Sequence, residues 1–317
     1  MLSIVINTKN AALTLNATLE SLQPLVEALA AEIIIVDTES TDQTPKIAQK
    51  NKAVKFFSHP NANYVEPVRQ FAINKAKRDW IFIIDSDEMT STTLNQQIID
   101  IVKNNILADF QADAYYLPRY NKIFGRYLQH TLWFPDYQLR LFRRGTIKWP
   151  KTLHAQPEIK GSVLHFPADQ GLSLLHDNYH SVEEYWQRAN RYSSIQAKEI
   201  AQTDYSPQPN DFSGLAFLEK FDSEFNRRFF AAQGYLDGNH GALLSLLQAA
   251  SDTTTLAKVW EEFDFSHQSL SPNQLRAFFH RRRQELNYFQ ADTILQTENQ
   301  LNFFSKLYWR LRRKFKI

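Results

Sequence analysis

Two aspartates that stand two positions apart are the clearest candidates for chemistry in this sequence. Asp85 and Asp87 directly follow an apolar run, residues 80–84. Carboxylate oxygens suit Mg²⁺ and Mn²⁺, which proteins commonly hold with one or two carboxylates together with substrate phosphates. Alternatively, Asp87 or Ser86 caps a helix that begins near Glu88. The pattern therefore indicates either a metal site for a phosphate-bearing substrate or a helix cap.

Asp37 stands in a similar place, directly after the apolar run 33–36. A carboxylate there could accept hydrogen bonds from a nucleobase or a ribose. Alternatively, it precedes a helix that Ser40 or Thr41 opens, with Asp42 as an acid in the first turn. The residue types leave both interpretations open.

The elements that must position these residues are short strands and the helices between them. Three runs are four or five residues long, rich in β-branched or aromatic residues and mostly apolar: 2–6, 33–36 and 80–84. Strands buried on both faces of a parallel sheet have this pattern. Helical patterns lie at 11–29, 41–49 and 67–77. This alternation predicts an α/β fold with a mostly parallel central sheet, whose ligands bind beyond the carboxyl ends of the strands.

The second half of the chain has a different pattern. Short strand-like pieces separated by turn signals occupy residues 110–177, and the pattern turns helical from about residue 180. A polar, proline-containing break at 201–213 indicates a boundary. We therefore expect an α/β domain over residues 1–205, a helical region over 206–300 and a tail helix over 301–317.

Composition excludes several classes of protein. The chain has 317 residues, of which 43% are hydrophobic and 22% charged, an ordinary globular balance. The first of its eight glycines is Gly125, so the glycine-rich phosphate loops of Rossmann and P-loop proteins cannot lie before it. The lack of cysteine rules out disulfides and thiolate metal sites and fits a reducing compartment such as the cytoplasm. We expect neither a secretory leader nor a membrane-spanning run.

The charge is concentrated at the C-terminal end. The net charge is +2, but residues 306–317 contain six basic residues and no acid, which argues against a general nucleic-acid binder. Apolar residues recur every three or four positions from Phe303 to Phe315, which predicts a basic amphipathic helix. We expect this helix to attach the chain to an anionic surface on the inner face of the cell membrane. The alternative is a helix that packs on the protein with a solvated basic face.

Four ordered motifs resemble family 2 glycosyltransferases of the GT-A fold, and more narrowly the bacterial lipopolysaccharide-core and cell-surface glucosyltransferases. The motifs lie in residues 7–10 with 36–42, in 80–88, in 133–145 (Trp-Phe-Pro-Asp-Tyr-Gln-Leu-Arg-Leu-Phe-Arg-Arg-Gly) and in 234–241 (Gly-Tyr-Leu-Asp-Gly-Asn-His-Gly). The sequence departs from the pattern at Glu39 and Gln43, where glycines are usual, and at Ala155, which follows His154 where an acid is usual.

The resemblance implies a metal-dependent, inverting transfer of a hexose from a nucleoside diphosphate sugar, with a UDP-sugar as first candidate, to a lipid-linked surface glycan such as the lipopolysaccharide core. It implies Mg²⁺ or Mn²⁺ as the cofactor, with Asp87, Asp85 and His154 as candidate ligands. It implies a donor site formed by Thr8, Asp37, Arg69, Asp85 and Arg140, with Arg140 also a candidate for an anionic acceptor.

Inversion also needs a general base on the face opposite the leaving diphosphate. Asp136 is the first candidate, because Trp133 and Tyr137 flank it and could stack on a sugar ring. It could equally be an ordinary turn aspartate. Glu88 is the second candidate, or it only orients its neighbours. The rival interpretations are an inactive or scaffold-type protein that binds nucleotide sugars at a membrane, and a sugar nucleotidyltransferase, which normally needs the missing glycine-rich loop.

Overall fold

The computed structural model describes the whole chain except residues 62–64, 105, 106, 108, 109, 151–155, 204–210, 266–268 and 299. Two compact units divide it. The first contains residues 1–129 and 133–181, and the second contains residues 130–132 and 182–317. The two units differ in class: the first contains the sheet and its covering helices, and the second is helical.

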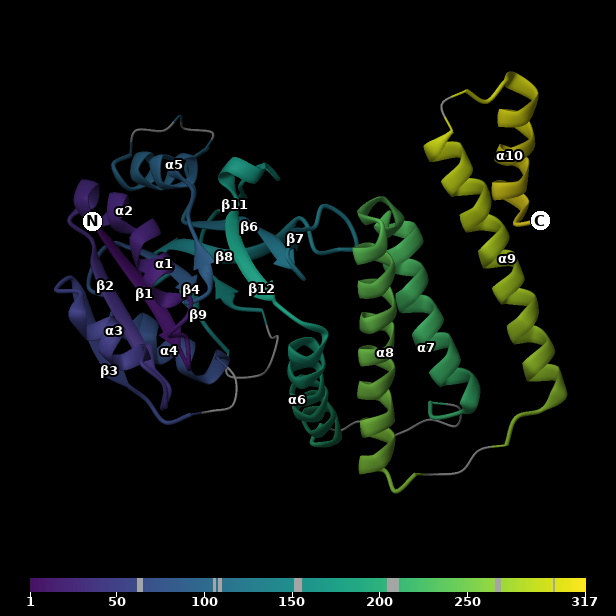
Figure 1. Ribbon diagram of the computed structural model, residues 1–317, viewed down its shortest axis with the longest axis horizontal. Helices are drawn as coiled ribbons and strands as arrows, with labels where there is room; N and C mark the ends of the chain where they lie inside the picture. Colours follow the sequence, from purple (N-terminus) through teal and green to yellow (C-terminus); the bar gives the residue numbers. More distant parts are fainter. Residues whose placement is uncertain are drawn as a thin grey trace. The chain divides into compact units, whose positions relative to one another are not determined.

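The first unit is built on a ten-stranded mixed sheet (Figure 1) with the order β3-β2-β1-β4-β8-β6-β12-β5, while β7 and β11 pair with β6. The strands of this sheet are β1 (Leu2–Thr8), β2 (Glu32–Asp37), β3 (Val54–Ser58), β4 (Trp80–Asp85), β5 (Glu88–Met89), β6 (Ala114–Ile123), β7 (Arg126–Tyr127), β8 (Asp136–Arg143), β11 (Val163–His165) and β12 (Leu174–Tyr179). Strands β9 (Ile147–Lys148) and β10 (Glu158–Ile159) form a small separate sheet. The strands β3, β2, β1 and β4 are parallel, and β8 joins β4 antiparallel.

Helices cover both faces of the parallel strands because the side chains of each strand alternate between two cores. Ile4 and Ile6 of β1 face a core that includes α1 (Leu15–Ser21), α2 (Gln23–Leu29), α3 (Thr44–Lys50) and α5 (Thr92–Val102). Val5 faces the opposite core, which includes α4 (Glu66–Lys75). Burial on both faces explains the consecutive apolar positions of these strands. The expected α/β fold, with its helical C-terminal region, is confirmed.

Three local expectations differ from the structure. The helical pattern 11–29 forms two helices, α1 and α2, with Pro24 in the first turn of the second. No strand was expected at β3, which is a half-buried edge strand. The alternative expectation of a helix that begins near Glu88 is wrong, because residues 86 and 87 form a turn and Glu88 begins β5. The next helix is α5, which Ser91 caps. Asp87 and Ser86 are therefore not helix caps.

The second unit is a set of packed helices. It contains α6 (Val182–Ala201), α7 (Gly214–Asn226), the π-helix η3 (Arg227–Ala231), the 3₁₀ helix η4 (Gly234–Asp237), α8 (Asn239–Glu262), α9 (Pro272–Thr297) and α10 (Phe303–Phe315). Both α6 and α7 pack on α8, and α10 packs on α9. Because α6 packs on α8, the structural division falls before Val182, whereas the sequence kept this segment in the first domain up to residue 205.

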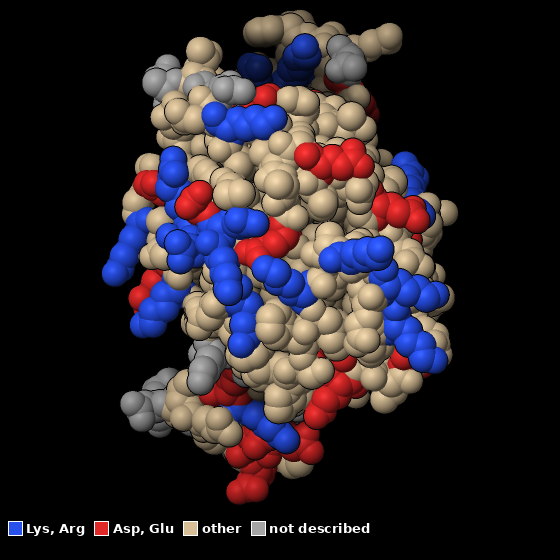
Figure 2. Space-filling model, turned by 90° about the vertical axis from the view of Figure 1, so that its left-hand side faces the viewer, with Lys and Arg blue, Asp and Glu red and all other residues tan. Residues whose placement is uncertain are grey.

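The predicted tail helix is present as α10, which has no buried residue although it packs on α9. Within the described ranges, no helix combines the length and the apolar character that crossing a membrane requires. On the face drawn in Figure 2, Lys and Arg side chains gather across the middle of the view, with Asp and Glu side chains among them and below them.

Candidate active site

The predicted donor residues come together because β1, β2 and β4 are parallel neighbours in register. Thr8 pairs with Asp37 across β1 and β2, and Asn7 pairs with Asp85 across β1 and β4. The Thr8 hydroxyl donates a hydrogen bond to Asp37 Oδ1 at 3.0 Å. The carboxyl ends of the three strands therefore form one polar edge, where open α/β sheets bind ligands.

Asp37 is engaged with its own turn. Its Oδ2 accepts the Ser40 backbone N–H at 2.9 Å, and its Oδ1 accepts the Ser40 hydroxyl at 2.6 Å. The residue is 4% exposed. Asp37 therefore shapes the loop after β2, and its predicted contact with a nucleoside stays a prediction. Beside it, the buried side-chain amide of Asn7 has no hydrogen-bond partner within the described structure, and such groups in native proteins normally find a ligand, a water or a protein partner.

Six charged side chains of alternating sign form a continuous chain of ion pairs, called here the charge ladder. Its members in order are Arg69, Asp85, Arg140, Glu88, Arg119 and Asp136. The successive nitrogen–oxygen distances are 3.3, 2.5, 2.6, 3.4 and 2.6 Å. The ladder joins α4, β4, β8, β5 and β6, so it links the predicted donor residues to the predicted base.

Asp85 is held between two guanidinium groups. Arg69 reaches Oδ1 and Arg140 reaches Oδ2. Burial alone would raise the pKa of Asp85, but the charges of Arg140 and Arg69 outweigh it and hold this pKa well below its usual range. Asp85 is therefore an anion at any physiological pH, and its predicted roles as metal ligand and ribose contact stay predictions.

Arg140 lies under the site. It is 1% exposed, and its Nη2 donates to both Asp85 and Glu88. Burial would lower its pKa, but the two carboxylates raise the pKa above the usual arginine value. Its Nε and Nη1 atoms have no hydrogen-bond partner within the described residues. Arg140 supports the carboxylates from the interior, and its predicted contact with a diphosphate stays a prediction.

Asp87 meets a histidine that the sequence had not singled out. His176 Nε2 lies 3.5 Å from Asp87 Oδ2, and His176 Nδ1 lies 2.6 Å from Asn121 Oδ1. Because an amide oxygen only accepts, Nδ1 carries the proton, and Nε2 of the neutral ring presents a lone pair to the carboxylate. Two such acceptors side by side can hold a cation between them. A pair of ligands of this kind suits a divalent ion that also takes phosphate oxygens.

The predicted ligand His154 lies outside the described residues. Within the described ranges, no group of three or more His, Cys, Asp or Glu side chains is arranged to hold a metal ion. The signal for His176 was the alternation of β12, in which Leu174, His176 and Asn178 are buried and the residues between them are not. Polar residues at the inward positions of a strand indicate a buried polar site rather than a hydrophobic core.

Asp136 is the first residue of β8 and lies opposite Arg119 of β6 in register. Its Oδ2 accepts Arg119 Nη2 at 2.6 Å, Arg119 Nε at 2.8 Å and Asn121 Nδ2 at 3.2 Å, while its Oδ1 accepts Gln138 Nε2 at 2.8 Å. Burial opposes ionisation, but the Arg119 charge and these hydrogen bonds keep the pKa of Asp136 below its usual value. The side chain remains 22% exposed. Its role as base stays a prediction, and Arg119 is a partner that sequence reasoning missed.

Glu88 is fully buried. Its Oε1 accepts from Arg140 and Arg119, and its Oε2 accepts the backbone N–H of Asp85 at 2.9 Å. A carboxylate without exposed surface does not present itself to an acceptor sugar. This placement favours the orienting role among the two that the sequence left open.

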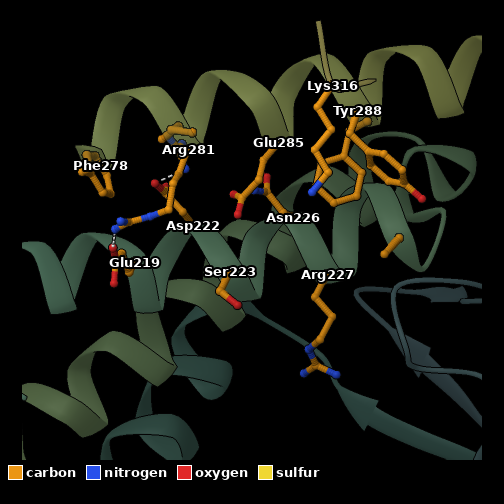
Figure 3. Close-up of a pocket in the computed structure, with 13 residues that line it drawn as sticks. Glu219, Asp222, Ser223, Asn226, Arg227, Phe278, Arg281, Glu285, Tyr288 and Lys316 are labelled. Carbon is orange, nitrogen blue, oxygen red and sulfur yellow. Dashed lines mark hydrogen bonds and ion pairs between the residues drawn. The ribbon is translucent and has the colours of Figure 1, made fainter. Parts of the chain in front are cut away.

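A large cavity lies elsewhere, inside the second unit (Figure 3). It measures about 710 Å³ and is lined by α7, η3, α9 and Lys316. Its walls carry both signs of charge, and ion pairs join Glu219 to Arg281 and Asp222 to Arg282. None of the predicted site residues lines it. The charge ladder, rather than this cavity, is where the candidate chemistry is gathered.

Comparison with known proteins gives a family match and several relatives. Residues 3–153 match the model of glycosyl transferase family 2. An uncharacterized glycosyltransferase of Rickettsia bellii is 28% identical, covering 82% of this chain and 86% of the relative. A lipopolysaccharide core biosynthesis glycosyltransferase, LpsC, of Rhizobium meliloti is 26% identical, covering 69% and 82%. Among solved structures, a mannosyltransferase of Pyrobaculum calidifontis in complex with GDP-Man and Mn²⁺ aligns with a TM-score of 0.44 at 12% identity, covering 99% and 87%.

Proposed function

We propose that this chain, whose residues 3–153 match the model of glycosyl transferase family 2, transfers a hexose from a nucleoside diphosphate sugar to a hydroxyl group of a lipid-linked surface glycan. A UDP-sugar is the first candidate for the donor, and the lipopolysaccharide core is the first candidate for the acceptor. The relative named for lipopolysaccharide core biosynthesis supports this choice of acceptor.

The observation that carries the proposal is the polar edge of the sheet. Asp85 ends β4 and Asp87 lies in the turn after it. His176 of β12 pairs in register with Glu88 of β5, and the Thr8–Asp37 pair lies at the ends of the neighbouring strands. This edge offers carboxylates and an imidazole for a metal and a diphosphate, and hydrogen-bonding groups for a nucleoside.

A divalent ion, Mg²⁺ or Mn²⁺, fits the donor set of Asp87 and His176. Their oxygen and nitrogen atoms are 3.5 Å apart, and the hydrogen bond from His176 Nδ1 to Asn121 fixes the ring. Diphosphate oxygens and water would fill the remaining coordination positions. When bound, such an ion supplies charge neutralisation at the leaving diphosphate.

Asp136 would act as the general base. The acceptor hydroxyl oxygen forms a bond to the anomeric carbon while the bond from that carbon to the diphosphate oxygen breaks, and the hydroxyl proton moves to the base. Attack from the face opposite the diphosphate inverts the configuration. The lowered pKa of Asp136 keeps it ionised before the reaction, and Oδ1 is the more available oxygen because Arg119 and Asn121 both use Oδ2.

We also propose that α10 attaches the chain to the cytoplasmic face of the membrane, where a lipid-linked acceptor is presented. Six apolar residues of α10, together with Ile317, are each at least 45% exposed: Phe303, Phe304, Leu307, Tyr308, Leu311, Phe315 and Ile317. Each basic residue near an anionic leaflet contributes about 1 kcal/mol of binding free energy. The exposed apolar side chains and the basic charge support this attachment.

Donor binding and turnover test the enzyme proposal. We expect Mn²⁺ with one of UDP-glucose, UDP-galactose or UDP-N-acetylglucosamine to raise the melting temperature, and the same donor to release UDP slowly without acceptor. Asp87→Ala and His176→Ala should each remove the metal-dependent part of binding. Asp136→Asn should keep binding and lose transfer. Binding without UDP release in the wild type would favour the scaffold interpretation, and no binding by any donor would contradict both.

Vesicle binding tests the attachment. The chain should sediment with vesicles of phosphatidylcholine and phosphatidylglycerol and not with pure phosphatidylcholine. Deletion of residues 303–317 should release it. Unchanged sedimentation of the truncated chain would contradict the role of α10.

A further inference from the structure

Three residues that immediately precede the candidate base segment belong to the second unit. This loop, His130–Leu132, is hydrogen-bonded to Asp237 of η4. Asp237 Oδ2 accepts the backbone N–H of His130 at 2.9 Å and the hydroxyl of Thr131 at 2.9 Å, and Oδ1 lies 3.3 Å from His130 Nδ1. Asp237 is 3% exposed, so these bonds are shielded from water.

Thr131 is held through all of its polar groups. Besides its hydroxyl, its N–H donates to the Ala232 carbonyl at 3.2 Å, and its carbonyl accepts Arg228 Nη1 at 2.8 Å. Arg228 is fixed in turn by Glu224, at 2.5 Å. Thr131 itself is fully buried. The backbone of the loop is therefore anchored independently of its side chains.

The loop adopts a backbone conformation that needs such an anchor. Thr131 and Leu132 both have φ of 62°, in the left-handed region that residues other than glycine rarely adopt. Two consecutive residues of this kind persist only where the surroundings over-determine them. The hydrogen bonds to Asp237, Ala232 and Arg228 supply that determination.

The glycines around Asp237 make room for this arrangement. A Cβ at Gly241 would lie 1.8 Å from the carbonyl oxygen of Gly234, and a Cβ at Gly234 would lie 2.7 Å from the Arg228 carbonyl oxygen and 3.1 Å from Thr131 Cγ2. At Gly234 and Gly241 the backbones of α8, η4 and the loop approach too closely for a side chain. We call residues 234–241, which hold the loop, the socket.

The loop leads directly into the residues of the candidate chemistry. Trp133 follows it, and its carbonyl accepts Asn121 Nδ2 at 2.8 Å, while the same Asn121 atom lies 3.2 Å from Asp136. We infer that Asp237 is a positioning residue for the transfer reaction: by holding residues 130–132 it fixes the start of the segment that carries Trp133 and Asp136. This inference rests on the proposed function, because it assigns Asp237 to that reaction.

The test compares chemistry, donor binding and local opening in Asp237→Ala. Because displacement of a catalytic group by about 1 Å can cost about 100-fold in rate, we expect UDP release to fall by about 10- to 100-fold. The Mn²⁺-dependent melting shift with the UDP-sugar should persist, and amide hydrogen exchange of residues 128–136 should rise while that of β1 and β4 does not. Asp237→Asn should recover much of the rate, because its amide oxygen can still accept from His130 and Thr131.

Thr131→Val removes one hydrogen bond without changing shape and guards against misfolding of the alanine variant. We expect it to lower UDP release without loss of donor binding. The matched control is Asp252→Asn, whose carboxylate pairs with Lys220 at 3.5 Å in the same unit and should leave every readout unchanged. Wild-type rates in Asp237→Ala, or an equal loss of donor binding, would overturn the inference. If the wild type releases no UDP, the proposed function fails, and unchanged hydrogen exchange at residues 128–136 in Asp237→Ala would overturn the socket separately.

Discussion

Arg140→Met removes the central cation of the charge ladder while filling a similar volume. In the wild type, Arg140 Nη2 serves Asp85 at 2.5 Å and Glu88 at 2.6 Å, and the residue is 1% exposed. After the change, Glu88 keeps only Arg119 at 3.4 Å and one backbone N–H, although it has no exposed surface. The perturbation therefore strands a buried negative charge.

The expected cost is large on the scale of single substitutions. Removing one partner of a buried ion pair costs about 3–5 kcal/mol, because the remaining charge keeps its desolvation penalty. For a domain of about 150–250 residues, each kcal/mol corresponds to about 2–4 °C in melting temperature. We expect Arg140→Met to lower the melting temperature of the first unit by about 6–20 °C.

Urea unfolding and a double-mutant cycle with Glu88→Gln provide the assay. Glu88→Gln makes the stranded side chain neutral, so Arg140→Met should cost less in that background, with a coupling of about 1–3 kcal/mol. Arg143→Gln is the matched control, since this arginine of the same strand is 49% exposed and pairs with Asp113 at 3.5 Å. A cost of less than about 1 kcal/mol for Arg140→Met, or strict additivity in the cycle, would refute the ladder as a buried, coupled network.

Three further predictions concern single carboxylates or their partners. The pKa of Glu32 is lowered from 4.5 to about 2, since Lys55 and neighbouring hydrogen bonds outweigh burial. Ionised Glu32 therefore stabilises the fold above pH ~4.5, and this stabilisation is lost as the pH falls through ~2. Glu32→Gln should lower the free energy of unfolding by about 2–3 kcal/mol at pH 7 and by little at pH 2, measured by urea unfolding. Arg119→Gln should move the acidic limb of the pH–rate profile for UDP release upward, because the guanidinium no longer lowers the pKa of Asp136; an unmoved limb would exclude Asp136 as the titrating base. Glu39→Gly should raise the free energy of unfolding by about 0.5–1 kcal/mol, because φ at this position is 59°; a loss of stability would contradict that backbone conformation.

Much of the sheet could be predicted because its signal is local. The runs 2–6, 33–36 and 80–84 became β1, β2 and β4, and burial on both faces is legible in consecutive apolar residues. The strand β3 was not predicted because it is a half-buried edge strand and carries Lys55 among its apolar residues. The split between α1 and α2 falls at Pro24, which is favoured in the first turn of a helix and interrupts a continuous helical pattern.

Only part of the site could be predicted from the sequence, because some of its residues are brought together by pairings between distant strands. Its acids follow strands in sequence, so Asp37, Asp85 and Asp87 could be found one at a time. Arg119 and His176 come from β6 and β12, and they reach the acids only through antiparallel and crossover pairings that no short window contains. Arg119 opposite Asp136 is a matter of register between two strands, and register depends on the whole sheet.

The backbone at Glu39 has the conformation typical of glycine although the residue is a glutamate. The family resemblance of the sequence predicts glycine at this position, but Glu39 stands there and its side chain is exposed. The backbone nevertheless adopts the left-handed conformation that glycine would take freely, with φ of 59°. The turn is kept because Asp37 accepts both the N–H and the hydroxyl of Ser40, and because the Thr38 N–H and hydroxyl both donate to the Thr8 carbonyl. The turn therefore forms without glycine at position 39, and the polar edge of the sheet is intact with glutamate there.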